Sequence, residues 1–394
     1  MKGFGTLYVF ELKKVLGQRL LLVSVLLGAA LLFGWNLLTF YGAGYYYRYD
    51  AQTNSVERFS RPYREVEALR RDSMRTLAGR ELDEPLMEAL IGQYRDDETG
   101  TVLWNLNPYT PFLYLNTMAD RTDITAEGFY AGYLCVFDPA FIPLTGEEQR
   151  YWQEMASTLD PLTLDYAGGW QAMAQNCGLL CQVTVLLTAV CLCRLFSQEH
   201  RTRTDQLVLS SARGKAVAFF ARWAAGSSFG AGLALVFSGL YVLLYCALYG
   251  PDGFSTALQL WSTGSRCPLH LSIGGFILLL LALLVLACML TAALVMFLSE
   301  LLRSAVPALA VPFLLSGLSL LDLFYGSGRL AEQVSSYLPF CRISPGTLQD
   351  FYLVTLGPFQ LNPLQFSFLL YALLALLCGT LCWGSYCGYQ VTGR

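Results

Sequence analysis

Residues 20–40 read LLLVSVLLGAALLFGWNLLTF, a run of 21 residues without a charged side chain. An α-helix rises about 1.5 Å per residue, so this run is roughly 30 Å long and matches the hydrocarbon thickness of a bilayer. A cleaved signal peptide is the alternative interpretation. The apolar run is too long for one, and no small-x-small cleavage site precedes the exit at residues 42–45. We therefore expect an uncleaved membrane-spanning helix.

The rest of the chain is apolar on the same scale. Of 394 residues, 55% are hydrophobic and 14% are charged, whereas soluble globular domains carry about 25% charged residues. Five further long apolar runs cover residues 172–193, 217–250, 271–299, 304–321 and 363–391. The sequence therefore predicts an all-α integral membrane protein with six transmembrane helices, both ends of which lie on one side of the membrane.

The distribution of charge predicts which side that is. The four lysines all flank apolar runs: Lys2, Lys13, Lys14 and Lys215. Residues 42–173 contain no lysine and carry 11 arginines against 21 acidic residues. Basic flanking segments face the cytoplasm, so we expect a multi-pass plasma-membrane protein with cytoplasmic N and C termini. The net charge of −3 gives no reason to propose a nucleic-acid partner.

Three regions follow from this topology. Residues 1–41 hold an amphipathic helix suited to the membrane interface, followed by the first span. Residues 42–173 form a mostly helical extracellular domain, with helices predicted over 64–78 and from Asp83 to Tyr94, and a capping box from Thr145 to Glu148. Residues 174–394 hold the remaining five spans and a cytoplasmic loop, 194–217. The external segment 337–340 is apolar enough to dip back toward the membrane.

Motifs for catalysis and metal binding are absent from the sequence. No GxxxxGK[ST] or HExxH pattern occurs, and the two histidines, His200 and His270, fall in loops predicted on opposite sides of the membrane. We therefore expect no catalytic residues, no metal site and no cofactor in this chain. Most cysteines lie in apolar runs and are expected to be buried, and a bond between Cys267 and Cys341 is left open by the sequence.

The cytoplasmic stretch 196–215 reads FSQEHRTRTDQLVLSSARGK. It resembles the coupling helix between the second and third spans of ABC-2-type transporter permeases, which contains an acidic residue, a Gly-Thr pair, a leucine-rich turn and a Ser-Pro-basic run. Arg203 stands in place of the usual glycine and Ala212 in place of the usual proline. The layout of an amphipathic helix, one span, a large insert and five spans is also similar. The positions on the family pattern are Glu199, Thr204, Leu207, Leu209, Ser211 and Arg213.

The resemblance implies the transmembrane permease subunit of an ABC-2-type exporter. ATP and Mg would bind to a separate nucleotide-binding ATPase, and a second permease half, either a copy or a homologue, would complete the membrane unit. Glu199, Thr204, Leu207, Leu209 and Arg213 would contact the ATPase. The alternative is that this loop only sets the topology.

Asp322, at the external end of the fifth run, is the acidic residue of that apolar stretch, and it either lines the translocation path or faces external water. Two other functional classes are possible alternatives. A membrane-embedded enzyme acting on lipid-linked substrates needs a cluster of titratable residues at one interface, and an ion-coupled secondary transporter places ionisable groups near the midplane. The sequence shows neither such a cluster nor clear midplane charges. The substrate is not specified, although the acidic insert suggests hydrophobic or cationic molecules.

Overall fold

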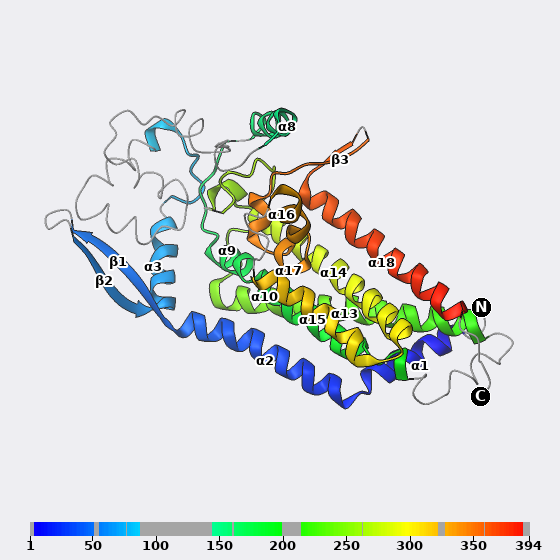
Figure 1. Ribbon diagram of the computed structural model, residues 1–394. Coiled ribbons are helices and arrows are strands. Elements are labelled where there is room, and N and C mark those ends of the chain that lie inside the picture. Colours follow the sequence, from blue (N-terminus) through cyan, green and yellow to red (C-terminus); the bar gives the residue numbers. More distant parts are fainter. Residues whose placement is uncertain are drawn as a thin grey trace.

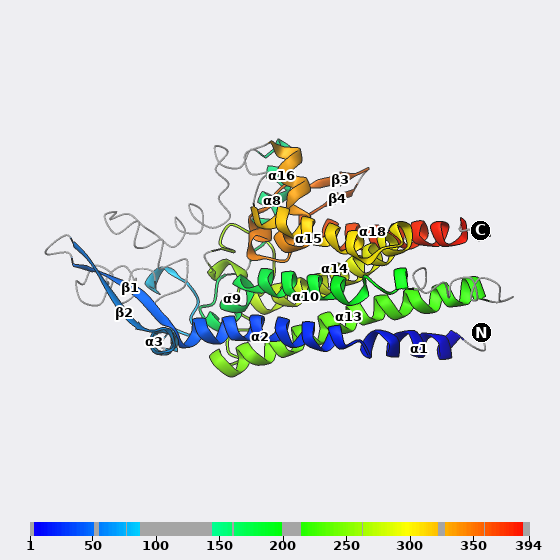
Figure 2. The ribbon, with the colours of Figure 1, turned by 60° about the horizontal axis from the view of Figure 1, so that its bottom comes forward.

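The computed structural model describes residues 4–50, 55–75, 77–86, 144–159, 161–198, 214–261, 263–321, 328–357 and 359–388. These residues are mostly helical and form an elongated bundle (Figure 1). Both chain ends are at one end of the bundle, called here the termini end (Figures 1 and 2). The two long strands and the first helices after them lie at the opposite end, called here the insert end. Among the predicted functional residues, Glu199, Thr204, Leu207, Leu209, Arg213 and Asp322 lie outside the described residues.

Four helices are long and apolar enough to cross a membrane: α2 (Arg19–Tyr41), α13 (Gly214–Tyr249), α14 (Ile273–Leu302) and α18 (Pro363–Gly388). A fifth candidate is the pair α9 (Gly168–Gln175) and α10 (Cys177–Leu192), which is bent by 44° and counts as one broken span. Such helices satisfy every backbone polar group internally, as a lipid environment requires. The chain is therefore a candidate multi-pass membrane protein with four to five spans.

The sixth expected span corresponds to α15 (Ala305–Leu321). Its 17 residues stand at the lower limit of the roughly 17–25 residues that cross a bilayer, because the helix begins immediately after the left-handed turn at Arg303. The structure places α15 beside α14 and α10, as expected for a member of the bundle. The six-span topology stays a prediction.

Helix α14 is the central element of the bundle and packs against α10, α13, α15 and α18. Its contact with α13 is close because of Gly230, where an added Cβ would stand 3.0 Å from the carbonyl oxygen of Cys288. A small residue at a helix contact lets two helix backbones approach closely in a membrane. In contrast, Gly384 on α18 has open space at its Cβ position, so it does not serve packing within the chain.

The amphipathic helix expected at the N terminus is α1 (Phe4–Leu16), which packs along α13. Glu11 and Val15 are buried on that side, whereas Phe10 and Leu16 are exposed. The helix thus has one face on protein and an apolar face turned outward, which is the arrangement that an interfacial helix needs.

The insert contains a β-hairpin that sequence reasoning missed. Strands β1 (Ala43–Asp50) and β2 (Ser55–Pro62) pair antiparallel from Ala43 with Pro62 to Asp50 with Ser55. The first part of the insert, residues 43–62, is therefore a β-hairpin and not helical as predicted. The first strand is rich in tyrosine, which favours strands, but strand formation needs a partner and is not visible in one segment alone.

The helices predicted in the insert are confirmed where the structure describes them. Helix α3 (Tyr63–Arg75) covers most of the predicted range, and α8 (Gly146–Ala156) begins with the expected capping box. In that box the Glu148 backbone N–H donates to the Thr145 hydroxyl at 3.3 Å, and the Thr145 backbone N–H donates to the Glu148 carboxylate at 2.8 Å. Asp83 accepts from the Leu86 N–H at 3.0 Å, as a helix cap does; the continuation to Tyr94 lies outside the described residues.

Short elements cover the insert end of the bundle (Figure 2). They are η1 (Leu258–Leu260), α16 (Arg329–Ser336), α17 (Pro339–Arg342), η2 (Pro345–Gln349), and the hairpin of β3 (Val354–Leu356) and β4 (Phe359–Leu361). Helix α17 contacts both α10 and α15. The segment that was expected to dip back therefore packs on the apolar helices and helps to position the cavity described below.

Candidate functional site

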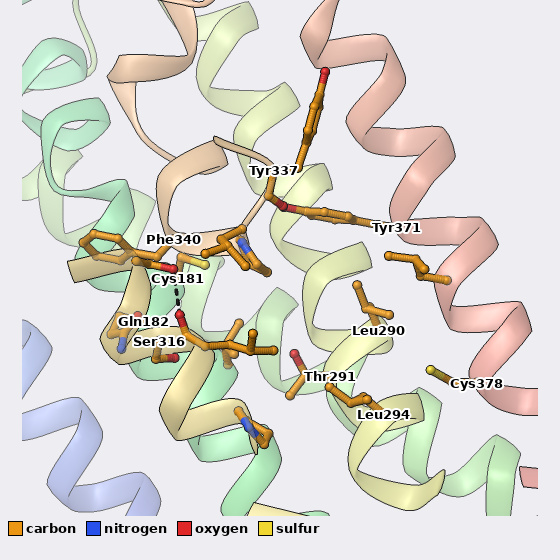
Figure 3. A pocket seen from close by; sticks show the side chains of 17 residues that line it. Cys181, Gln182, Leu290, Thr291, Leu294, Ser316, Tyr337, Phe340, Tyr371 and Cys378 are labelled. Atoms are coloured by element: carbon orange, nitrogen blue, oxygen red, sulfur yellow. Dashed lines mark hydrogen bonds between the residues drawn. The ribbon is translucent and has the colours of Figure 1, made fainter. Parts of the chain in front are cut away.

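An apolar cavity of about 230 Å³ lies between α10, α14, α15 and α18 and is closed at one side by α17 (Figure 3). Figure 3 shows Phe340 and Cys181 at one side of it and Leu294 and Cys378 at the other. The remaining apolar wall includes Val185, Leu290, Leu315, Pro312 and Leu374. The cavity is thus built from helices that are far apart in sequence, and we call it the membrane cavity.

The polar side chains on its wall add little polarity. The Thr291 hydroxyl donates to the Ala287 carbonyl at 2.8 Å, and the Ser319 hydroxyl donates to the Leu315 carbonyl at 2.9 Å. Both donors are therefore used within their own helices. Gln182 contributes an amide to the wall. Such a cavity suits an apolar ligand group and offers no nucleophile with an adjacent base for catalysis.

Phe340 forms the boundary of the membrane cavity at α17. Its ring lies over Gly178 of α10, where an added Cβ would stand 3.4 Å from the ring. The neighbouring Tyr337 is held at its carbonyl oxygen by the Tyr371 hydroxyl of α18, at 2.9 Å. Helix α17 is therefore seated on α10 by ring packing, and the C-terminal end of α16 directly before it is tied to α18 by a hydrogen bond.

A second cavity of about 460 Å³ adjoins the first at the insert end and has more polar side chains in its lining; we call it the vestibule. Ser319 and Phe340 line both cavities, so these two side chains stand at the border between them. The other lining side chains of the vestibule come from α16, α17 and the segment around η2: Glu332, Ser335, Ser336, Cys341, Arg342, Ser344, Thr347 and Asp350. The two cavities are thus neighbours, and the vestibule has the more polar lining.

Arg342 organises the wall of the vestibule. Its side chain is 1% exposed and lies 2.8 Å from the Asp350 carboxylate and 2.7 Å from the Ser336 hydroxyl. The guanidinium also lies 4.4 Å from the centre of the Tyr337 ring, a cation–π distance. Burial raises the pKa of Tyr337 to about 12, so the ring is neutral at physiological pH. These contacts join α16, α17 and η2 into one unit.

The insert contacts this unit through Glu148 of α8. The Glu148 carboxylate, on a residue 4% exposed, pairs with Arg329 of α16 and accepts from the Leu353 backbone N–H at 3.1 Å. The indole N–H of Trp152 donates to the Phe351 carbonyl at 2.8 Å. Burial of a carboxylate costs free energy unless it is paired and hydrogen-bonded, and here it is both. Helix α8 therefore holds two of the segments that surround the vestibule.

At the termini end, buried polar contacts surround the start of the loop predicted to couple to an ATPase. The Ser197 N–H donates to the Ser299 hydroxyl at 2.9 Å, and that hydroxyl donates to the Cys193 carbonyl at 2.9 Å. Arg222 of α13 is 2% exposed, lies 3.3 Å from Glu11 of α1, and lies 5.0 Å from the centre of the Phe196 ring. The segment directly after α10 is thus fixed to α13 and α14, and α13 is in turn joined to α1.

The residues predicted from sequence to contact the ATPase or to line the translocation path are not among those that the structure describes. Glu199, Thr204, Leu207, Leu209 and Arg213 lie between the end of α10 and the start of α13, and Asp322 directly follows α15; all six lie outside the described residues. Their roles stay predictions.

Sequence reasoning singled out the segment that contains Phe340 but missed two other residues that line the cavities, Ser319 and Arg342. The sequence signal for this region is an arginine in an otherwise arginine-poor predicted external loop. Arg342 directly follows the apolar segment 337–341, and an arginine at that place suggests a buried ion pair beside the apolar helices.

Two further expectations concern cysteine and metal. Cys267 and Cys341 are both described and are not joined to each other by a disulfide; the Cys341 thiol instead donates to the Ser319 carbonyl at 3.7 Å. Within the described residues, no group of three or more His, Cys, Asp or Glu side chains could hold a metal ion. No protein-family model, no curated protein and no solved structure matches this chain.

Proposed function

We propose that the chain is the transmembrane permease subunit of an ABC-2-type exporter. The observation that carries the proposal is that α10, which lines the membrane cavity, leads into the predicted coupling loop, and that α14, which also lines it, is hydrogen-bonded to the first residues of that loop. Helix α10 passes the cavity at Cys181 and ends at Leu192, directly before the loop, and α14 carries both Leu290 at the cavity and Ser299. Ser299 hydrogen-bonds to both the end of α10 and the first residues of the loop. A force on the loop would therefore reach two walls of the cavity.

In this proposal six spans, counting α15, cross the plasma membrane, with both termini and loop 194–217 in the cytoplasm and the insert outside. A separate ATPase subunit binds ATP and Mg and engages Glu199, Thr204, Leu207, Leu209 and Arg213. Closure of two ATPase subunits presses on the loops of two permease halves, and the packed helices respond as rigid bodies that switch between inward and outward access. Asp322, directly after α15, lies near the outer end of the path.

The two other classes receive less support. A membrane-embedded enzyme needs a cluster of titratable groups at one interface, and in the described residues the buried Arg342 near the cavities is paired with Asp350. An ion-coupled transporter needs ionisable groups near the midplane. The buried pair of Glu11 and Arg222 joins α1 to the start of α13 at the termini end, away from the middle of the spans.

The test is recovery of the ATPase partner from native membranes. Mild-detergent purification of the full chain should recover a P-loop ATPase in stoichiometric amount, identified by mass spectrometry. The double substitution Glu199→Ala with Leu207→Ala should release it, because it removes a charged and an apolar contact of the docking surface. The matched control is His200→Ala with Gln206→Ala in the same loop, off the family pattern, which should retain the ATPase. Absence of any ATPase from the wild-type preparation, or equal retention by both variants, contradicts the proposal.

A further inference from the structure

We propose that a cavity at the termini end binds the head group of an anionic phospholipid, whose acyl chains lie along α2 and α15. The cavity has a volume of about 1010 Å³ and lies between the first residues of α2, the segment directly after α10, and the turn from α14 to α15. We call it the basic cavity, after Arg19, Arg194 and Arg303 in its lining. The site requires only that the long helices cross a bilayer, so it does not depend on ATP-driven transport.

The basic cavity is at the ends of apolar helices. Arg19 is the first residue of α2, Arg194 follows the last residue of α10 by two positions, and Arg303 is in the turn between α14 and α15. Helices α2 and α14 are candidate spans, and α10 is part of the broken span. The ends of membrane-spanning helices lie at the level of the lipid head groups. The phosphates of a bilayer are therefore at the depth of this cavity.

Two arginines of the lining are available to an anion. Arg19 and Arg194 are both exposed, and neither forms an ion pair or a side-chain hydrogen bond with another residue that the structure describes. Among the described residues of the lining, none is acidic. The adjoining loop is basic as well, because residues 194–217 carry five Lys or Arg against two Asp or Glu. Guanidinium groups bind phosphate oxygens strongly, and basic pockets between transmembrane helices bind anionic head groups.

Two helix N termini add to this charge. Helix α2 begins at the cavity, and its N-cap residue, Gln18, makes no side-chain cap hydrogen bond. Helix α15 begins at Ala305, which also lines the cavity. The free N–H groups and the positive end of the dipole favour an anion beside the first turn of a helix. The two dipoles and the arginines therefore attract a ligand of the same charge.

The apolar part of the lining favours a lipid over a soluble phosphate. Leu20 and Val306 line the cavity and are 39% and 78% exposed. Leu27 and Phe313, two turns further along the same faces of α2 and α15, are also exposed. No described residue of the lining is aromatic, so the cavity offers no ring on which a nucleotide base could stack. A phospholipid places its phosphate at the arginines and its acyl chains on this apolar surface.

Native mass spectrometry of the full chain in mild detergent tests the site, by titration with dioleoyl phosphatidylglycerol or dioleoyl phosphatidylcholine. The first phosphatidylglycerol should bind about tenfold more tightly than the first phosphatidylcholine, because its head group has a net negative charge. Arg19→Gln and Arg194→Gln should each weaken its binding about fivefold, as expected for the loss of one basic residue beside an anionic lipid. The matched control, Arg150→Gln, removes the same charge from the exposed surface of α8 and should leave binding unchanged.

Soluble competitors separate a lipid from a free anion. Inorganic phosphate and glycerol 1-phosphate, each in large excess, should leave phosphatidylglycerol bound, because neither has acyl chains; displacement by either one overturns the lipid. Equal affinity for the two lipids overturns the preference for an anionic head group. A loss for Arg150→Gln as large as for Arg19→Gln and Arg194→Gln overturns the site, because the net charge of the chain then decides binding. The ATPase is absent from these measurements, so their failure leaves the proposed permease function standing, and loss of the ATPase partner leaves this site standing.

Discussion

Glu11 and Arg222 form a buried ion pair between α1 and α13, and removing one charge should loosen α1 from the bundle. The two side chains are 9% and 2% exposed and lie 3.3 Å apart. Removing one partner of a buried pair costs about 3–5 kcal/mol, because the other charge stays buried without compensation. Arg222 also keeps the ring of Phe196 at 5.0 Å. Glu11→Gln should therefore fall near the lower limit, about 3 kcal/mol.

The assay is reversible unfolding in mixed detergent micelles, followed by tryptophan fluorescence, on Glu11→Gln, Arg222→Met and the double variant. The double variant should be more stable than the sum of the single effects predicts, by about 1–3 kcal/mol, because it leaves neither charge buried alone. Lys14→Met is the control: Lys14 is 27% exposed and lies 3.7 Å from Glu11, so its loss should cost about 0–1 kcal/mol. Additive single effects, or a cost for Glu11→Gln no larger than for Lys14→Met, would refute the reasoning.

Three further outcomes are expected. Glu148→Gln weakens the pairing of α8 with α16, so it should lower the free energy of unfolding by about 1–3 kcal/mol and speed limited proteolysis after α8. Glu147→Gln on the exposed face should match the wild type. Equal cleavage of both variants would show that the pairing of Glu148 with Arg329 is unimportant. Gly230→Leu drives a side chain into the backbone of α14 and should lower stability by about 1–3 kcal/mol. Gly384→Leu, in open space, should change stability by less than about 0.5 kcal/mol. Unfolding curves of the two variants that coincide would contradict the close contact of α13 with α14. Asp350→Asn removes the carboxylate that faces the buried guanidinium of Arg342, so it should lower the free energy of unfolding by about 3 kcal/mol in the same assay. A decrease below about 1 kcal/mol would mean that water, not Asp350, compensates the charge of Arg342.

Patterns confined to one segment predicted the local elements well. The apolar run 20–40 falls within α2, the capping box at Thr145 starts α8, and the charged repeat after residue 64 forms α3. Each depends on contacts within a few residues along the chain, which a single segment already contains. The hairpin of β1 and β2 was missed because each strand needs the other, and the pairing partner of Ala43 is Pro62, many residues away.

What the sequence by itself determined about this protein is its candidate membrane spans and its helix caps, because the length of an apolar run and a capping motif are both set by consecutive residues. What only the tertiary structure decided is where polar and apolar space meet. The membrane cavity and the vestibule share Ser319 of α15 and Phe340 of α17, and the insert reaches the vestibule through Glu148 and Arg329. These groups are up to about 190 residues apart in the chain, so no periodicity links them; close packing of long helices brings them together.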